Sequence, residues 1–484
     1  MLQHVTTPPL PPERFGDVLT AEQTEAFERA IAVAGEMLTG RVVWNVNSTA
    51  TGGGVAEMLR SLIPYARGGG VDARWVVIDG TSDFFRVTKR IHNRLHGWPG
   101  DGGDLGDEER EIYEAASAAN AAELTELVAP GDVVILHDPQ TAGLAATVRD
   151  AGAHVIWRCH VGIDQPNGLT RSAWEFLRPY VTPAERYVFS RQAFAWDGLD
   201  IERIALIPPS IDAFSPKNQR LDPRAVDAIL QVAGLAPGDD HTAACYTRQD
   251  GSPARVDRSA QRWEAAVIPA DVPLIVQVSR WDRLKDPEGV IEGFARGIAH
   301  RTLAHMLLAG PDVTAVADDP EGLEVLNECI DHRRSLPTPI QERVHLAALP
   351  MDDAEENATI VNAIQRRATV AVQKSLAEGF GLTVAEAMWK ARPVVASRIG
   401  GIQDQIVDGE SGVLVDPRDL DQYGTAVVAL LEDPAHADLM GQAAHVRVRD
   451  AFLGSRHLSQ YLDLLTDLIH GPRAPVAGLA QPLN

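Results

Sequence analysis

Short apolar runs alternate with amphipathic segments of helical length along almost the whole chain. Four of these runs are RVVWNVN (41–47), DVVIL (132–136), HVIWRC (154–159) and LIVQVS (274–279). They are short and rich in β-branched residues, as strands covered on both faces of a sheet are. The alternation therefore predicts an α/β protein with doubly wound parallel sheets. Ligands of such sheets bind beyond the carboxyl ends of the strands.

The chain is too long for one ordinary core, because 484 residues exceed the usual size of a single domain. The rigid, turn-rich segment PPSIDAFSP (208–216) has the composition of a linker. Residues 217–270 are polar, contain one expected helix at 223–232, and resemble a lead-in or insertion whose role the sequence does not reveal. We expect a first Rossmann-like domain at 1–212 joined by a C-terminal helix at 455–469, a second at 213–454, an irregular Pro-rich start at 1–18, and a disordered tail at 471–484.

Composition restricts the possible partners. The net charge is −23, with 67 acidic and 44 basic residues, which argues against a nucleic-acid partner or an anionic membrane surface. No signal-like segment and no run of 18 apolar residues is present, so we expect no membrane association. The three cysteines are far apart, which argues against disulfides and zinc and indicates a reducing cytoplasm. The acidic pair Asp419 and Asp421 lies in PRDLDQ, which is typical of a capped helix start and not of a metal site.

The stretch SLAEGFGLTVAEAMWKA (375–391) carries the strongest chemical signal. Glycines allow the backbone to approach a ligand, and the helix expected from Leu382 presents free N–H groups and a positive dipole end to an anion such as phosphate. Glu386, one turn into that helix, suits the paired hydroxyls of a ribose, and Glu378 suits the hydroxyls of a second group. A phosphate-linked ligand with a hydroxylated group at each end describes a nucleotide sugar.

Three further stretches could contribute to an anion or sugar site. STATGGG (48–54) follows a strand, although it is neither a G-x-G-x-x-G fingerprint nor a Walker loop and such loops are often tight turns. Arg280 and Lys285 follow the strand at 274–279 and precede a helix with Asp286 as cap, where two cations could clamp a diphosphate or simply be surface charges. The loop 400–402 (GGI) could bring bare backbone to the donor sugar.

Polar residues also follow the strands of the first domain. Asn47, Asp138 and His160 each stand at a strand end, so we expect them to face one cleft. The alternative for His160 is a hydrogen-bonded core histidine.

The sequence also resembles a known family. EGFGLTVAE is similar to the Glu-x7-Glu signature of the retaining, GT-B-fold glycosyltransferases of the sucrose-synthase-like family 4. Within that family, STATGGGVAEML, LHDPQ, WRCH, PPSIDAFSPKN and VSRWDRLKDP resemble the trehalose glycosyltransferring synthases, and the resemblance spans roughly residues 38–470. It implies two Rossmann-like domains with an interdomain cleft, and it matches R-x4-K to a donor-phosphate pair.

The resemblance further implies a reaction. Glucose would pass from a nucleoside diphosphate glucose to the anomeric hydroxyl of free glucose with retention, giving α,α-trehalose. A same-face displacement would let the leaving phosphate accept the proton of the acceptor, so that catalysis is positioning plus charge stabilisation. The catalytic candidates are His160, Arg280, Lys285 and Glu378. The donor-binding candidates are Gly53, Gly54, Arg280, Lys285, Gly381, Leu382, Thr383 and Glu386. The acceptor-binding candidates are Asn47, Asp138, Gln140 and Arg158, with Trp44 as a weaker one.

Several alternatives stay open at this point. A retaining trehalose phosphorylase would share the fold and use glucose 1-phosphate, and another family-4 enzyme would use a different acceptor, such as a lipid or polymer. A nucleotide-sugar sensor would bind without turnover. The family implies no required cofactor, with stimulation by Mg²⁺ left open, and a homodimer. The donor base and the physiological direction cannot be inferred from the sequence.

Overall fold

The computed structural model describes residues 1–471 except 52, 240, 265 and 314–319. The chain forms two compact units, and each has its own core. Unit 1 consists of Met1–Pro209 together with the residues from Gly454 onward, and unit 2 is Ser210–Leu453. Residues 472–484 of the tail predicted at 471–484, and Gly52 of the glycine loop, lie outside the described residues.

Unit 1 contains a seven-stranded sheet within the described residues, in the order β1-β3-β2-β4-β5-β6-β7. All neighbouring strands are parallel except for β1, which pairs antiparallel with β3 at one edge. The prediction of a doubly wound parallel sheet is confirmed. The prediction that residues 1–18 are irregular is wrong at β1, because the edge of β3 offers free backbone groups for Gln3–Val5 to pair with. The strands are β1 (Gln3–Val5), β2 (Val42–Asn47), β3 (Asp72–Val77), β4 (Val133–His137), β5 (His154–Cys159), β6 (Arg186–Phe189) and β7 (Ile204–Leu206).

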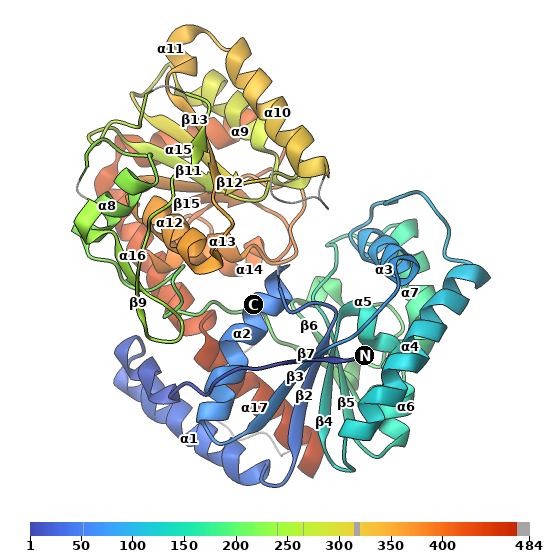
Figure 1. Cartoon of the computed structure of the whole chain (residues 1–484). Coiled ribbons are helices and arrows are strands. Elements are labelled where there is room, and N and C mark those ends of the chain that lie inside the picture. Colours follow the sequence, from blue (N-terminus) through green and yellow to red (C-terminus); the bar gives the residue numbers. More distant parts are fainter. Residues whose placement is uncertain (52, 240, 265, 314–319, 472–484) are drawn as a thin grey trace. The chain divides into compact units, whose positions relative to one another are not determined.

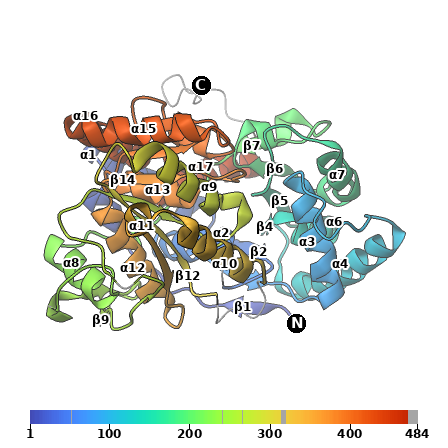
Figure 2. The same cartoon turned by 90° about the horizontal axis from the view of Figure 1, so that it is seen from above.

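Helices cover both faces of this sheet (Figures 1 and 2). One face carries α1 (Ala21–Met37), α2 (Gly53–Gly68) and α17 (Gly454–His470), which share an apolar cluster with alternate residues of the strands. The other face carries α3 (Ser82–Leu95), α4 (Asp107–Leu127), α6 (Ala145–Asp150) and α7 (Gly168–Val181). The short α5 (Asp138–Thr141) follows β4 directly. The red α17 thus lies beside the blue α1 and α2, although it is the last helix of the chain.

Unit 2 repeats the architecture. Its sheet has the order β10-β13-β12-β11-β14-β15-β16 and is parallel except for β10. The strands are β10 (Gln261–Arg262), β11 (Leu274–Val278), β12 (His305–Pro311), β13 (Val344–Leu349), β14 (Val370–Gln373), β15 (Val394–Ser397) and β16 (Val413–Val415). The helices are α8 (Pro223–Val232), α9 (Pro287–Gly293), α10 (Pro320–Ser335), α11 (Thr338–Gln341), α12 (Ala354–Arg367), α13 (Leu382–Trp389), α14 (Ile402–Gln405), α15 (Leu420–Glu432) and α16 (Pro434–Ala451). The helix expected at 287–299 ends as α-helix at Gly293 and continues as one π-helical turn.

The segment 217–270 is an integral part of unit 2. It contributes α8, a two-stranded hairpin of β8 (Cys245–Thr247) and β9 (Pro253–Arg255), and the edge strand β10. The carboxylate of Glu356, on α12, is buried and accepts hydrogen bonds from the backbone N–H groups of Asp257 and Arg258, at 2.7 and 2.8 Å. Arg248 donates to Asp353, the residue that caps α12. The segment therefore fastens the start of α12, because buried carboxylates need donors.

Candidate functional site

Backbone contacts join the loops that follow β11 and β14. The carbonyl of Leu284 accepts a hydrogen bond from the N–H of Leu376 at 2.7 Å. The side chain of Gln277, on β11, donates to the carbonyl of Lys285 at 2.9 Å and accepts from the N–H of Lys374 at 3.0 Å. These contacts hold the two strand ends together, and so they bring Lys285 to the loop that contains Glu378.

Lys285 and Glu378 form the centre of the candidate site of unit 2. The Lys285 Nζ lies 2.5 Å from Glu378 Oε2, and the two side chains are 16% and 12% exposed. The Ser375 hydroxyl lies 3.4 Å from the same oxygen. Arg280, in contrast, is 67% exposed and donates to Asp282 at 3.1 Å. Of the two cations that the sequence predicts to act together, Lys285 contacts Glu378 and Arg280 is held by Asp282.

A second lysine beside this pair is structural. Lys374 is buried and donates to the Asp286 carboxylate and, at 2.8 Å, to the carbonyl of Pro417. Asp286 has φ 50° and caps α9 by accepting from the N–H of Gly289 at 3.2 Å, as the sequence predicts for this cap. The Lys374–Asp286 pair therefore anchors the start of α9 next to Lys285.

The glycine loops before α13 and α14 pack backbone against backbone. Gly381 has φ 85° and precedes the first turn of α13, where N–H groups have no helical acceptor. Gly400 has φ 45°, and a Cβ there would stand 1.8 Å from the carbonyl oxygen of Glu378. The N–H of Gly401 donates to the carbonyl of Gly379 at 2.9 Å. Gly400 and Gly401 therefore pack against the loop that carries Glu378. The sequence predicted instead that their backbone approaches a donor sugar.

Glu386, on α13, is 1% exposed. Its Oε1 lies 3.4 Å from the Nζ of Lys217. The next residue, Asn218, accepts a hydrogen bond from Lys390 at 2.9 Å. Lys217 was not among the predicted site residues. It lies in PPSIDAFSPKN, one of the stretches that resemble the trehalose glycosyltransferring synthases.

In unit 1, Asp138 connects the ends of β4 and β5. Its φ is 65°, an uncommon value for a residue other than glycine, and Pro139 follows. Its Oδ1 accepts a hydrogen bond from the N–H of His160 at 2.7 Å, and its carbonyl accepts from Trp157 Nε1 at 3.1 Å. Burial raises the pKa of the Asp138 carboxyl to about 7, against the opposing effects of the His160 N–H and of Arg158. The predicted partners Asp138 and His160 are therefore in direct contact.

Gln140 and the glycine loop complete the predicted residues of unit 1. The buried Gln140 Oε1 has no hydrogen-bond partner within the described part of the chain. Because buried polar atoms normally have a partner, this oxygen is a candidate acceptor for a ligand hydroxyl. Gly53 has φ 79° and begins α2, and Gly54 follows it in the helix. The loop before them is closed by the Asn47 side chain, which donates to the carbonyl of Thr49 at 2.7 Å.

His160 stands in a group of polar rings. Its Nε2 lies 3.1 Å from the Nδ1 of His137, and the two rings are stacked at an interplanar angle of 15°. His137 Nε2 lies 3.2 Å from Asn45 Oδ1. Burial, together with the charge of Arg158, lowers the pKa of His137 to about 3 and that of His160 well below its usual range. Both rings are therefore neutral at physiological pH.

Three acceptor-binding predictions need correction, because the side chains involved are already used by the fold. Asn47 is 3% exposed and accepts from Trp75 Nε1 at 2.8 Å in addition to its bond with Thr49. Trp44 is 1% exposed and donates to Asp132 at 3.1 Å. Arg158 is fully buried and donates to other protein groups. None of the three presents a polar atom to a sugar.

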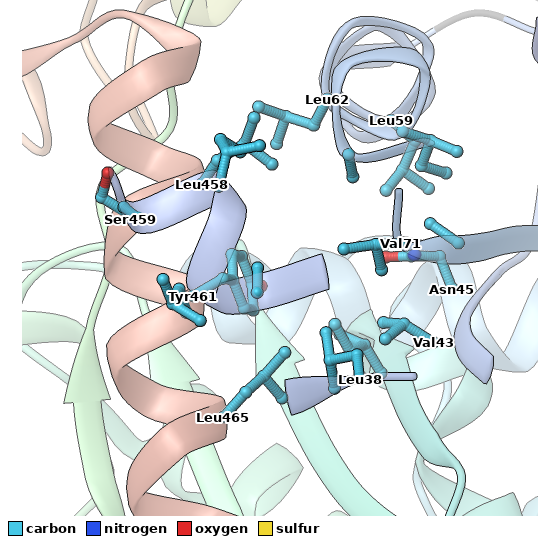
Figure 3. Close-up of a pocket in the computed structure, with 18 of the residues that line it drawn as sticks. Leu38, Val43, Asn45, Leu59, Leu62, Val71, Leu458, Ser459, Tyr461 and Leu465 are labelled. Carbon is cyan, nitrogen blue, oxygen red and sulfur yellow. The ribbon is translucent and has the colours of Figure 1, made fainter. Parts of the chain in front are cut away.

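An apolar cavity of about 90 Å³ lies behind this group of rings, between α1, α2, α17 and the sheet. Figure 3 shows Leu458, Tyr461 and Leu465 of α17 opposite Leu59 and Leu62 of α2. The few polar groups in its lining include Asn45 and His137. The cavity therefore lacks the dense polar groups that a sugar requires.

Two general observations concern the described residues as a whole. In them, no helix combines the length and the apolar character needed to cross a membrane. No cluster of three or more His, Cys, Asp or Glu side chains suited to a metal ion occurs there either. Asp419 caps α15 by accepting from the N–H groups of Asp421 and Gln422, so the acidic pair is a helix start.

Family models match both halves of the chain. The model described as "Trehalose synthase, N-terminal domain" matches residues 45–196, which include Asp138 and His160. The model described as "Glycosyl transferases group 1" matches residues 353–447, which include Glu378 and Glu386. The segment with Arg280 and Lys285 lies outside both matches.

Solved structures show the same fold at low identity. The α,α-trehalose-phosphate synthase from Burkholderia vietnamiensis aligns with a TM-score of 0.62 at 16% identity, over 88% of this chain and 96% of that chain. The sucrose-phosphate synthase from Thermosynechococcus elongatus aligns with a TM-score of 0.58 at 16% identity, over 89% and 100%. Together with the two parallel sheets and the matched glycosyltransferase domain, these similarities define the protein as a glycosyltransferase of the GT-B fold.

Curated relatives narrow the class. The chain is 36% identical over 433 residues to the trehalose synthase of Pyrococcus horikoshii, covering 90% of this chain and 91% of that protein. It is 34% identical over 461 residues to that of Rubrobacter xylanophilus, covering 94% and 97%. The chain belongs to the trehalose synthase family. A trehalose phosphorylase from Pleurotus pulmonarius is more distant, at 26% identity over 84% of this chain and 54% of that protein.

Proposed function

We propose that this enzyme transfers glucose from a nucleoside diphosphate glucose to the anomeric hydroxyl of free glucose, with retention, and so forms α,α-trehalose. The observation that carries the proposal is the identity of more than a third of the residues, over nine-tenths of the chain, with a protein named trehalose synthase. The residues at the two sets of strand ends supply the chemistry that such a reaction needs.

Unit 2 has the groups for the donor. Lys285 and the N–H groups of Leu382 and Thr383 would hold the diphosphate, since an ammonium and a helix start both favour phosphate. Arg280 would leave Asp282 to join them, which its exposure permits. Glu378 would accept hydrogen bonds from the glucose hydroxyls. Glu386, held in place by its contact with Lys217, would accept hydrogen bonds from the ribose hydroxyls.

Unit 1 has the groups for the acceptor. The carboxyl group of Asp138 and the Oε1 of Gln140, which has no partner among the described residues, would accept hydrogen bonds from glucose hydroxyls. His160, held as a neutral ring, would meet a hydroxyl of the transferred sugar near the reacting carbon.

The reaction itself needs no nucleophile from the protein in this proposal. The bond between the anomeric carbon and the leaving phosphate oxygen breaks as the acceptor oxygen approaches on the same face, and a leaving phosphate oxygen takes the acceptor proton. Lys285 and Arg280 would stabilise the charge that develops on the diphosphate, as preorganised donors do. Because the protein supplies these charges, we propose that no metal cofactor is required and that Mg²⁺ at most stimulates the reaction. We also propose that the partners of the enzyme are small molecules and that it forms a homodimer.

A product assay tests the proposal. Purified enzyme is incubated with free glucose and, separately, ADP-, UDP- and GDP-glucose, without added metal, and the product is analysed by NMR. Trehalose with a single α-anomeric signal supports the proposal, and the best donor identifies the base. Trehalose formed only from glucose 1-phosphate, with release of phosphate, would instead identify a phosphorylase, the activity named for the more distant relative. A non-reducing disaccharide with a β signal would contradict retention.

A further inference from the structure

Arg158 is a buried cation that joins distant parts of unit 1. It lies on β5, two residues before His160, and is fully buried. Its Nε donates to His160 Nε2 at 3.1 Å, and its Nη2 donates to the carbonyl of Ile207 at 3.0 Å. Its Nη1 donates to the hydroxyl of Tyr461 at 2.8 Å and lies 3.2 Å from the Nε2 of His457. The guanidinium of Arg158 thus contacts the residue after β5, the residue after β7, and the helix α17.

We propose that Arg158 is a positioning residue for His160, and that through Arg158 the C-terminal helix α17 forms part of the support of the active site. The inference rests on the proposed role of His160. It replaces the predicted role of Arg158 as an acceptor ligand, which its complete burial excludes.

The hydrogen bond from Arg158 fixes the protonation of His160. An arginine N–H can only donate, so the ring nitrogen that it meets carries a lone pair. A doubly protonated ring would instead oppose an N–H group and a like charge. Burial lowers the pKa of His160 most, and the charge of Arg158 and then His137 lower it further. The neutral ring is therefore a consequence of the position of Arg158 as well as of burial.

Other charged and titratable groups surround the same ring. Asp138, on α5, accepts from the backbone N–H of His160. His137, on β4, stacks on the ring. Arg456 and His457, on α17, lie around Arg158, and burial beside Arg158 lowers the pKa of both. Only Arg158 carries a fixed positive charge in direct hydrogen-bond contact with the His160 ring, within the described residues.

Tyr461 offers a mild way to disturb this arrangement. Its ring stacks on His457, lies 5.5 Å below the Arg158 guanidinium, and lines the apolar cavity (Figure 3). A Tyr461→Phe variant removes the hydroxyl that accepts from Arg158 and keeps the ring that packs. Because the variant keeps the ring and most of the cavity wall is apolar, it should fold.

Three variants separate charge from geometry. Arg158→Lys keeps the positive charge and loses the forked hydrogen bonds. Arg158→Gln loses the charge and keeps one donor. Tyr461→Phe keeps Arg158 and removes one of its acceptors. The matched control is Tyr187→Phe. Tyr187 is a buried tyrosine of the same unit, and among the described residues its hydroxyl makes only a 3.4 Å contact with the Thr182 carbonyl.

The first measurement is a substrate-free NMR titration of the His160 ring signal, identified by its loss in His160→Asn. The pH range of about 5.5–8 spans the ordinary histidine pKa of about 6.5. Within this range we expect no titration of His160 in wild type or in Arg158→Lys. In Arg158→Gln we expect the pKa of His160 to rise toward that ordinary value but to stay below it, because burial is the larger cause of the lowered pKa and remains in the variant. An unchanged His160 in Arg158→Gln would overturn the electrostatic part of the proposal. Because no substrate is added, this result does not depend on which reaction the enzyme catalyses.

The second measurement is turnover of the donor that the product assay identifies, as a function of pH. We expect kcat to fall by about tenfold in Tyr461→Phe and Arg158→Lys with the donor KM unchanged, the size expected for one lost hydrogen bond to a charged group. In Arg158→Gln, the acidic limb of the pH profile should also move to higher pH than in wild type, while staying below the ordinary histidine pKa of about 6.5 because the ring remains buried. Equal losses in Tyr461→Phe and the Tyr187→Phe control, or a change in KM alone, would contradict a positioning role.

Discussion

Lys285 and Lys374 give a direct comparison of a proposed catalytic lysine with a structural one. Both follow strands of the same sheet and both pair with a carboxylate, Glu378 for the former and Asp286 for the latter. They differ in burial, because the side chain of Lys285 is 16% exposed and that of Lys374 is 1% exposed. We expect Lys285→Met to reduce turnover and Lys374→Met to reduce stability. Methionine keeps most of the apolar stem in each case.

The magnitudes follow from these surroundings. Lys374→Met removes a buried ammonium that donates to Asp286, whose side chain is 19% exposed, and to the carbonyl of Pro417, and the loss of these two bonds costs about 2–3 kcal/mol and lowers Tm by on the order of 5–10 °C. Lys285→Met removes a partly exposed ammonium and leaves Glu378, 12% exposed, with the Ser375 hydroxyl 3.4 Å away, so the loss of stability is smaller, about 1 kcal/mol. Loss of a donor to the developing charge of the leaving group costs about 2.7–4 kcal/mol of transition-state stabilisation, or roughly 10²–10³-fold in kcat.

Calorimetry and a continuous assay of nucleoside diphosphate release distinguish the two lysines. The expected result is a slow but stable Lys285→Met enzyme and a Lys374→Met enzyme that melts early but turns over at low temperature. Turnover of Lys285→Met within threefold of wild type would refute the role of Lys285 in holding the leaving group. A Lys374→Met enzyme with wild-type Tm would refute the reasoning from burial.

Three further predictions concern other parts of the site. Because burial raises the pKa of Asp138 to about 7 from about 3.9 in an unfolded chain, its contribution to stability is present below about pH 4 and is lost as pH rises through 7. Asp138→Asn should therefore gain Tm relative to wild type at pH 8 compared with pH 5, and an equal difference at both would contradict the raised pKa. Lys217→Met should raise the donor KM by about tenfold, because it disturbs the buried Glu386, and Lys217→Arg should restore the KM. With donors that lack the 2′ and 3′ hydroxyls of the ribose, the KM should no longer depend on Lys217. Gly400→Ala should weaken donor binding and lower Tm because its Cβ meets backbone 1.8 Å away, whereas the control Gly168→Ala, with open space around it, should do neither.

The loop before α13 was predictable because its signal is local. The start of α13 at Leu382 follows from residues adjacent in the sequence, as does the cap of α9 by Asp286. Strand boundaries were also accurate where apolar runs were bounded by polar residues. For example, β5 spans the predicted His154–Cys159.

The residues that sequence reasoning missed are positioned by contacts between distant segments. Nothing near Arg158 in the sequence indicates that Tyr461, 303 residues later, accepts its hydrogen bond. Lys217 reaches Glu386 only because the segment after the linker packs on α13. The short β1 was missed for the same reason, since three residues form a strand only when an existing edge pairs with them.

The return of α17 to unit 1 has a consequence for synthesis of the chain. The sheet of unit 1 is complete in sequence by Leu206, yet the helix that covers one of its faces begins at Gly454, after the whole of unit 2. Until that helix leaves the ribosome, the apolar side of α1 and α2 has no cover and Arg158 has neither Tyr461 nor His457 beside it. Unit 2 can therefore mature first, as a domain inserted into an unfinished one, and newly made chains are most exposed to aggregation in that interval. A chain that stops before α17 would lack these two contacts of Arg158, and with them part of the support that we propose for His160.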